Sequence, residues 1–186
     1  MSPVPNGERA VHLASAGLPG DDLSEDPNLS IAEEPAARAL REMLMAWRSW
    51  PKEGRLPRRN AFDPVDFPRL LSWMLLFEYE ARPNRYRDYD MLYRYVGSAF
   101  ADTLQSEGLT GTHLSALPDP FPGRWFPTFD RLRRDAKPIA VHGKPYLIDK
   151  TYFRFELLYL PLARNAPADP DAVAFNLICM HREVVD

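Results

Sequence analysis

The pattern of apolar and polar positions changes its period along the chain, and the first regular stretch is helical. In PAARALREMLMAWRSW, residues 35–50, apolar side chains recur three and four positions apart, which is typical of an amphipathic helix. Pro35 suits a first helical turn, and Pro51 cannot continue the helix. We therefore expect an amphipathic helix over residues 35–50. Its apolar stripe contains Leu40, Met43, Leu44 and Trp47.

Five later stretches have the pattern of β-strands. LLSWMLLFEYE, from Leu70 onward, is a continuous apolar run with a polar end, typical of a strand that is buried on both faces. After a polar turn at 82–90, the stretch MLYRYVG at 91–97 completes a hairpin. Three more strands are expected at 138–148, 151–162 and 172–180.

Helical patterns separate the second strand from the third. Ser98 can cap the brief segment AFADTLQSEG, which Gly108 ends, and GRWFPTFDRLRRDAK at 123–137 indicates a longer helix. Short links between sequential strands favour antiparallel pairing, so the inserted helices must fold over one face of the sheet. The sequence therefore predicts an α+β fold with a five-stranded antiparallel sheet, a helical cover on one face and an N-terminal amphipathic helix.

Composition divides the chain into an acidic N-terminal segment and one globular unit. Residues 1–34 hold seven acidic side chains against Arg9, with several prolines and few aliphatic residues. Such a segment cannot bury enough apolar surface to offset the entropy of ordering it. With 186 residues, of which 45% are hydrophobic, the chain has apolar material for one core. We expect a disordered acidic tail over 1–34 and a single domain over 51–186.

Charge and hydropathy disfavour two classes of partner. The net charge is −3, and basic pairs such as Arg58-Arg59 are interrupted by acids and prolines, which disfavours a nucleic-acid surface. No run reaches the roughly 18 to 20 apolar residues of a membrane span, and the first residues lack the basic and apolar regions of a leader. We expect a cytoplasmic protein that binds neither nucleic acid nor membrane.

Cysteine chemistry and metal binding have little support. The single cysteine, Cys179, cannot form an intramolecular disulfide, and the four histidines lack metal-ligand spacing. Cys179 and His181 share one face of a predicted strand, which would suit a small cysteine-dependent hydrolase whose imidazole activates the thiol. Residues two apart on a strand are roughly 6.5 to 7 Å apart, too far for a direct hydrogen bond. A cysteine within FNLICM is also typical of a buried core residue.

The strand at 151–162 supplies candidate binding residues, because alternation places its aromatic side chains toward the helices. These side chains either line a cavity for a small ligand or fill the core. The candidate cavity residues are Phe100, Trp125, Phe129, Phe153, Phe155, Leu157 and Tyr159. Arg94 joins them if it points inward, where it needs an anionic partner such as a ligand carboxylate or Glu156; pointing outward, it is solvated.

The other face of that strand carries leucines that need a cover. The amphipathic helix at 35–50 is the available candidate, either from the same chain or from a second copy. This requirement predicts a homodimer with a two-fold axis. The predicted contact residues are Leu40, Met43, Leu44, Trp47, Leu158 and Leu160.

Four stretches carry a resemblance to a known family. They are WRSWPKEGRLPRRNAFDPVDFPRLLSWMLLFEY (47–79), YRYVGSAFADTLQSEGLTGTHLSAL (93–117), GKP (143–145) and YFRFELLYLPL (152–162). Together they span about residues 36–182. In this order they resemble the PAS superfamily, and in particular a group of alphaproteobacterial single-domain PAS-like proteins formerly listed as a domain of unknown function.

The resemblance implies a five-stranded antiparallel sheet with a helical cover, used in sensing and in protein–protein signalling. It implies neither a reaction nor a particular ligand, because function belongs to the site and not to the fold. Flavin photosensing in this superfamily needs a cysteine after an Asn-containing helical motif, which this chain lacks. Haem-binding relatives usually offer a histidine from the long helix, and 123–137 has none. No cofactor is expected, although haem at His113 or His142, or another small ligand, stays open.

We therefore expect a non-catalytic sensor or adaptor module in bacterial regulation, which binds a small ligand, an unknown regulatory protein, or both. A ligand between the sheet and the cover formed by 98–137 would shift the population of a closed form. One alternative is a constitutive dimeric adaptor that binds no ligand. The other is the small hydrolase that uses Cys179 and His181.

Overall fold

The computed structural model describes residues 29–119, 121–143 and 153–184, which form an α+β unit. Its strands are β1 (Leu29–Ala32), β2 (Met74–Glu80), β3 (Asp90–Val96), β4 (Ile139–Gly143), β5 (Phe153–Leu162) and β6 (Phe175–Val184). Its α-helices are α1 (Arg38–Ser49), α2 (Ser98–Leu104) and α3 (Phe121–Asp135). Short 3-10 turns lie at Arg59–Ala61, Pro64–Asp66, Leu71–Trp73 and Leu114–Ala116.

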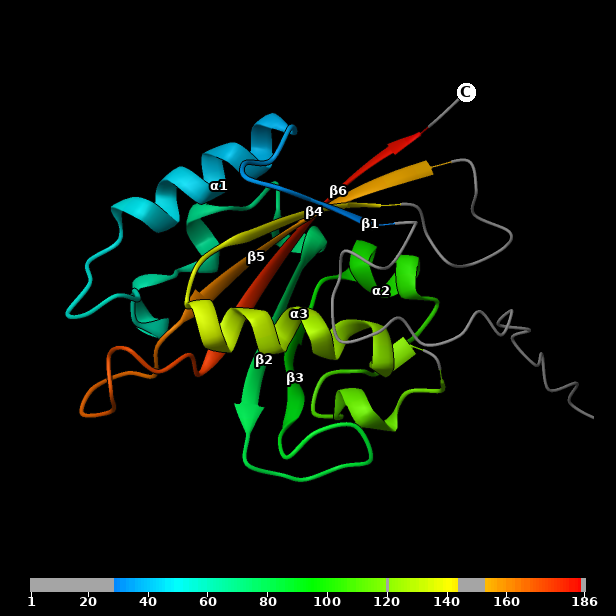
Figure 1. Cartoon of the computed structure of the whole chain (residues 1–186). Coiled ribbons are helices and arrows are strands. Elements are labelled where there is room, and N and C mark those ends of the chain that lie inside the picture. Colours follow the sequence, from blue (N-terminus) through cyan, green and yellow to red (C-terminus); the bar gives the residue numbers. More distant parts are fainter. Residues whose placement is uncertain (1–28, 120, 144–152, 185–186) are drawn as a thin grey trace, which may run out of the picture.

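The six strands form one open antiparallel sheet in the order β1-β4-β5-β6-β2-β3 (Figure 1). The long strands β5 and β6 lie at the centre, where they pair from Phe153↔Val184 to Leu162↔Phe175. The hairpin of β2 and β3 extends the sheet on one side, and β4 and β1 extend it on the other. The helices α2 and α3 are inserted between β3 and β4, in the position that the sequence predicted.

The expected number of strands is wrong by one. Residues 29–32, inside the segment expected to be a disordered tail, form β1 and pair with β4, with Ile31 opposite Val141. Ile31 is partly buried and packs against the core beneath α3. A short strand gains this stability only from a partner more than 100 residues away in sequence, which local patterning does not reveal. Residues 1–28 lie outside the described residues.

Each face of the sheet packs against its own helix. On one face, α3 runs across the strands (Figure 1) and covers a core that we call the α3-side core. It includes the fully buried rings of Phe77, Tyr93, Phe100, Phe126 and Phe129. On the other face, α1 covers a second core, the α1-side core. Alternation along β5 serves both, because Leu157 and Tyr159 belong to the first core and Leu158 and Leu160 to the second.

The N-terminus of α1 is held by a carboxylate from the sheet. No side chain of the helix caps it, because Ala37 occupies the N-cap position. Instead Glu156 of β5, only 5% exposed, accepts hydrogen bonds from the backbone N–H groups of Ala36 at 2.6 Å and Ala37 at 2.7 Å. Its charge also suits the positive end of the helix. His142 of β4 places its Nε2 atom 3.1 Å from the same carboxylate.

A glycine makes the turn from β3 into α2 possible. A Cβ atom at Gly97 would lie 2.4 Å from the carbonyl oxygen of Ser72 and 2.5 Å from that of Leu71. The Gly97 N–H also donates to the carbonyl of Met74 at 2.8 Å, which ties the turn to the start of β2. Only glycine lets the two backbones approach so closely.

Among the helices of the described ranges, none has the length and apolar character needed to cross a bilayer.

Candidate functional site

The side chains beneath α3 form the interior that could hold a ligand. Phe77 of β2 lies at the centre, with ring centroids 5.3 Å from Phe129, 5.8 Å from Trp125 and 4.3 Å from Tyr93. These rings meet at tilted or edge-on angles, as aromatic side chains prefer. Six of the candidate residues belong to this core or pack against it: Phe100, Trp125, Phe129, Phe155, Leu157 and Tyr159. The rings fill the space that an open ligand cavity would need.

Two polar side chains nevertheless lie inside this core. Tyr93 and Asn176 are both fully buried, and neither the Tyr93 hydroxyl nor the two polar atoms of the Asn176 amide finds a hydrogen-bond partner among the described residues. Asn176 faces α3, because its neighbour Leu177 belongs to the α1-side core and its register partner Phe77 to the α3-side core. Phe77 is also the register partner of Tyr93, so all three occupy one row across the sheet.

The phenol of Tyr93 stays neutral in this environment. Burial, with a smaller contribution from the Asp90 carboxylate, raises the pKa of the Tyr93 hydroxyl above its ordinary value. The Tyr93 hydroxyl and the Asn176 amide can therefore donate and accept hydrogen bonds but carry no charge. Sequence reasoning missed both residues. The signal for Asn176 was a polar residue in the middle of the apolar run AVAFNLICM.

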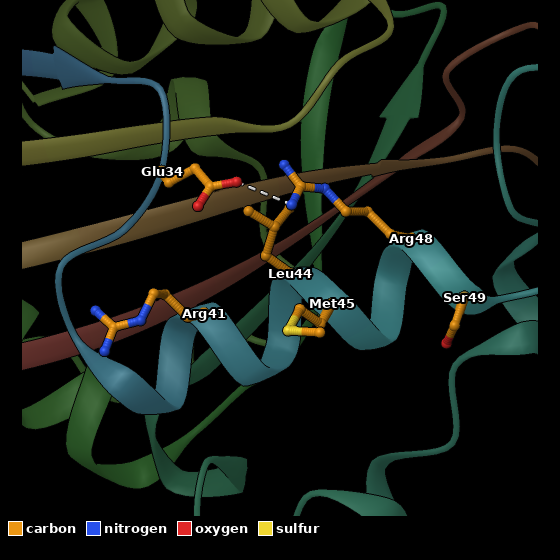
Figure 2. A pocket seen from close by; sticks show the side chains of 6 residues that line it. All are labelled: Glu34, Arg41, Leu44, Met45, Arg48 and Ser49. Atoms are coloured by element: carbon orange, nitrogen blue, oxygen red, sulfur yellow. Dashed lines mark hydrogen bonds and ion pairs between the residues drawn. The ribbon is translucent and has the colours of Figure 1, made fainter.

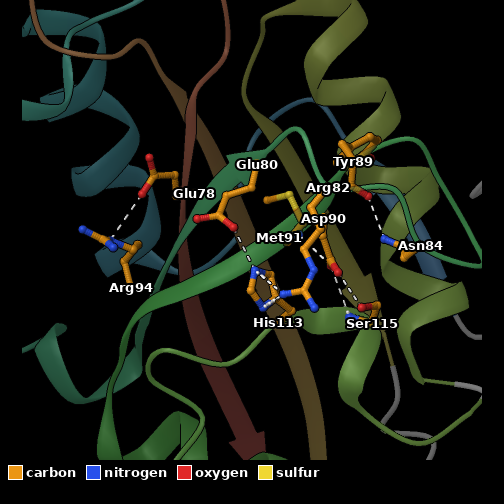
Figure 3. Close-up of polar contacts among 10 residues, drawn as sticks. All are labelled: Glu78, Glu80, Arg82, Asn84, Tyr89, Asp90, Met91, Arg94, His113 and Ser115. Carbon is orange, nitrogen blue, oxygen red and sulfur yellow. Dashed lines mark hydrogen bonds and ion pairs between the residues drawn. The ribbon is translucent and has the colours of Figure 1, made fainter.

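Two predicted cavity residues lie elsewhere. The side chain of Arg94 is 54% exposed and forms an ion pair with Glu78 of β2 at 3.4 Å, so it points away from the interior (Figure 3). Arg94 lies on the opposite face of β3 from Tyr93, and the carboxylate that pairs with it belongs to Glu78 and not to Glu156. Phe153 is the buried first residue of β5, with the Arg182 guanidinium 5.5 Å from its ring centroid, and it is not among the described members of the two cores.

The predicted dimer contacts are interior residues of a single chain. The six residues are Leu40, Met43, Leu44, Trp47, Leu158 and Leu160, and all belong to the α1-side core. The α1 helix of the same chain thus supplies the cover that the leucines of β5 require. Trp47 also donates from Nε1 to the carbonyl of Pro161 at 3.0 Å. Because this stripe is buried, it offers no surface to a second copy.

A polar network lies where the hairpin of β2 and β3 meets the turn after α2 (Figure 3). His113 places Nε2 2.8 Å from Glu80, and Arg82 donates to its Nδ1 at 2.7 Å. A guanidinium can only donate and a carboxylate can only accept, so this arrangement suits a ring that accepts at Nδ1 and donates from Nε2. Next to it, the Asp90 carboxylate accepts from the hydroxyl and backbone N–H of Ser115.

This network is a poor centre for catalysis or haem binding. Both ring nitrogens of His113 already have polar partners, Arg82 and Glu80, so neither is open to bind iron. His142 directs its Nε2 atom to Glu156 at 3.1 Å. No group of three or more potential metal ligands occurs among the residues that the structure describes. The network instead ties the turn at 109–115 to the edge strand β3, where the backbone N–H of Tyr93 donates to the Thr112 carbonyl at 3.0 Å.

The Cys179–His181 pair lacks the features of an activated nucleophile. Cys179 is fully buried in the α1-side core, and burial raises the pKa of its thiol. A thiol in such surroundings is protonated and unreactive. His181 is exposed in the C-terminal half of β6. The geometry therefore fits the structural interpretation of Cys179 better than the hydrolase alternative.

A surface hollow lies beside α1, on the side of the sheet away from α3. Its volume is about 410 Å³ (Figure 2). The lining residues are Glu34, Arg41, Leu44, Met45, Arg48 and Ser49. Arg48 reaches across it to form an ion pair with Glu34 at 2.9 Å. Sequence reasoning missed this surface because it considered only the buried stripe of the helix.

Comparison of the chain with family models, curated proteins and solved structures finds no match.

Proposed function

We propose that the chain is a non-catalytic, PAS-like sensor that binds a small, uncharged polar molecule between α3 and the sheet and signals to a protein partner. The observation that carries this proposal is the fully buried Asn176 amide, which has no hydrogen-bond partner among the described residues. A buried polar group left unpaired costs about 1 to 3 kcal/mol. Such a cost is expected where a ligand supplies the missing partners.

The arrangement of the elements supports the PAS-like part of the proposal. The consecutive strands β2 to β6 form five adjacent antiparallel members of the sheet. The segment from α2 to α3 interrupts them between β3 and β4 and packs on one face. This arrangement supports the sheet and helical cover that the resemblance of residues 36–182 implies. The strand β1 is an addition at the β4 edge.

The chemistry of the buried groups defines the class of ligand. The Asn176 amide offers one acceptor and two N–H donors, and the Tyr93 hydroxyl offers a donor and an acceptor. A site built from such neutral groups selects a molecule that reciprocates its hydrogen bonds and rejects an analogue that lacks them. The surrounding rings of Phe77, Trp125 and Phe129 would contact the apolar part of that molecule.

The close packing of those rings indicates how binding becomes a signal. A ligand fits beside Asn176 only if α3 moves outward or its rings change rotamer, because Phe77, Phe126 and Phe129 are fully buried. Binding therefore favours a second position of α3, and the ligand shifts the population of the two states. The filled core is also the observation that favours the alternative function, a constitutive adaptor without a ligand.

Native mass spectrometry of the purified chain tests the proposal, followed by denaturing extraction and analysis of small molecules. Asn176→Leu replaces the amide with an apolar side chain of similar size, and Cys179→Ala changes the opposite face of the same strand as a control. We expect a stoichiometric neutral compound in the wild-type chain and in Cys179→Ala, and its loss from folded Asn176→Leu. An empty wild-type chain, or equal retention by Asn176→Leu, would contradict the sensor proposal.

A further inference from the structure

The Asn176 amide lies beneath the ring of Phe129 on α3. The Phe129 ring centroid is 5.3 Å from that of Phe77 and 6.2 Å from that of Tyr79, both on β2. It is 6.3 Å from the ring centroid of Tyr159 on β5. Strand β6 runs between β2 and β5, and its Asn176 faces α3 at the level of Phe77. The Phe129 ring therefore covers the amide, with aromatic rings on both sides of it.

The two polar atoms of this amide lie side by side, and both lack hydrogen-bond partners among the described residues. Oδ1 of Asn176 can accept a hydrogen bond, and one N–H of Nδ2 points to the same side and can donate. A partner that satisfies both atoms needs a donor and an acceptor next to each other. An asparagine side chain pairs with the edge of a nucleobase in the same way, through two parallel hydrogen bonds.

We propose that the ligand is a flat ring that carries an N–H donor next to a carbonyl acceptor, which is the edge of a lactam. The inference rests on the proposed function and names the chemical class of its ligand. The N–H of the ligand donates to Oδ1 of Asn176, and its carbonyl accepts from Nδ2. One ligand edge thus satisfies both buried atoms of the amide.

Other functional groups match this amide less well. A ketone or an ester offers only acceptors, which would leave Oδ1 of Asn176 unpaired. A hydroxyl group donates and accepts through one oxygen atom, so it cannot form two parallel hydrogen bonds. A carboxylate also only accepts, and its charge would need a partner of opposite sign in the interior. A lactam edge pairs with both amide atoms and stays neutral.

The aromatic side chains around the amide set the shape of the ligand. Phe129 is fully buried, so a ligand reaches Asn176 only when this ring moves aside. A flat six-membered ring then fills the space between Phe77 and Tyr159 that the phenyl ring occupies. Pro127, two positions earlier, lacks the N–H of a regular helical hydrogen bond, which weakens α3 next to this ring. The ligand therefore replaces one aromatic ring with another that has a polar edge.

α-Pyridone is the probe for this inference, in proton–nitrogen NMR spectra of the full chain. It is a flat ring with the lactam edge, whereas α-pyrone is the same ring with an oxygen atom in place of the N–H group. Any co-purified compound is removed first by unfolding in urea and refolding. The reporters are the side-chain amide of Asn176 and the indole N–H of Trp125, whose ring centroid is 5.9 Å from that of Phe129. We expect α-pyridone to bind with a dissociation constant of about 1 mM and α-pyrone to bind at least about tenfold more weakly.

Two variants on β6 show whether the amide is responsible. Asn176→Leu removes both polar atoms, and it should stay folded because it replaces an unpaired buried amide with an apolar side chain of similar size. Cys179→Ala is the control on the opposite face of the strand. We expect α-pyridone to shift the Trp125 signal of the wild-type chain and of Cys179→Ala, but not that of Asn176→Leu. Circular dichroism checks that each variant is folded.

Three results would overturn the inference: no binding of α-pyridone up to about 20 mM, equal binding of α-pyrone, or equal binding by Asn176→Leu. The compound that mass spectrometry identifies separates this inference from the proposed function. A stoichiometric neutral compound without a lactam edge would contradict the ligand class and leave the sensor proposal intact. An empty chain that binds α-pyridone through Asn176 would do the reverse.

Discussion

The carboxylate of Glu156 makes a measurable prediction, because it joins the central strand β5 to the start of α1. Glu156→Ala removes the acceptor of the Ala36 and Ala37 N–H groups and the partner of His142. No side chain within α1 can take over, since its N-cap residue is Ala37. We expect the first turn of α1 to fray and the α1-side core to lose stability.

The magnitude follows from the number of bonds lost. A hydrogen bond to a charged group contributes about 1.5 to 3 kcal/mol, so two of them set an upper limit of about 6 kcal/mol. The removal of a buried carboxylate also relieves its desolvation cost, and the freed N–H groups lie near the surface, where water can reach them. Loss of a helix cap typically costs about 0.5 to 2 kcal/mol. We therefore expect Glu156→Ala to lower the free energy of unfolding by about 2 to 3 kcal/mol.

Urea unfolding followed by far-ultraviolet circular dichroism measures this change, provided that the slope of the transition stays constant. Glu156→Gln keeps one acceptor oxygen and should lose about half as much free energy. Glu42→Ala is the control, because Glu42 is exposed on the same helix, and it should cost less than about 0.5 kcal/mol. The reasoning is refuted if Glu156→Ala and Glu42→Ala have the same midpoint.

Three further outcomes follow from the packing. Gly97→Ala should lower the free energy of unfolding in urea by more than about 2 kcal/mol, because its Cβ atom would meet backbone oxygens. Gly111→Ala has open space around it but a φ of +85°, so it should cost only about 1 kcal/mol. Equal losses for the two variants would contradict this reasoning. Iodoacetamide should label Cys179 in urea but not in the native chain near neutral pH, as mass spectrometry can show, because burial raises the pKa of the thiol. Burial also raises the pKa values of four tyrosine hydroxyls, so the folded state keeps them neutral. Their contribution to the free energy of unfolding is fully present below the unfolded pKa of about 10, and it is lost as the pH rises toward the higher folded pKa values. The phenolate absorbance of these four tyrosines should therefore appear together with unfolding as the pH rises. A phenolate transition separate from the unfolding transition would refute the conclusion that burial keeps them neutral. The tyrosines are Tyr79, Tyr89, Tyr93 and Tyr159.

Periodic patterning predicted the elements whose stability comes from their own apolar face. The helix expected over 123–137 corresponds to α3, two residues earlier at each end, and the strand expected at 151–162 contains β5. The continuous apolar run from Leu70 did not show at which residue the strand begins. Residues 71–73 form a 3-10 turn, and β2 begins at Met74. Residues 144–152, which cover the end of one expected strand and the start of the next, lie outside the described residues.

The features that the sequence did not reveal depend on distant partners. The strand β1 has only four residues and needs β4, and the orientation of Arg94 depends on Glu78 across the hairpin. Glu156 was considered only as a partner for Arg94. A clue to its role was available, because the start of the helix, Pro35-Ala36-Ala37, contains no residue that can cap it. A helix without a local cap needs one from elsewhere in the fold.

The central position of the two C-terminal strands has a consequence for how the chain acquires its structure during synthesis. The β2–β3 hairpin can form early, but the other edge of β2 pairs with β6, which is made about 100 residues later. The apolar stripe of α1 likewise waits for β5. Until residues 153–184 have left the ribosome, an open strand edge and two apolar surfaces lack their native partners. Contacts this distant in sequence favour slow folding and expose the nascent chain to aggregation, so the final step of folding should be cooperative and should involve both cores.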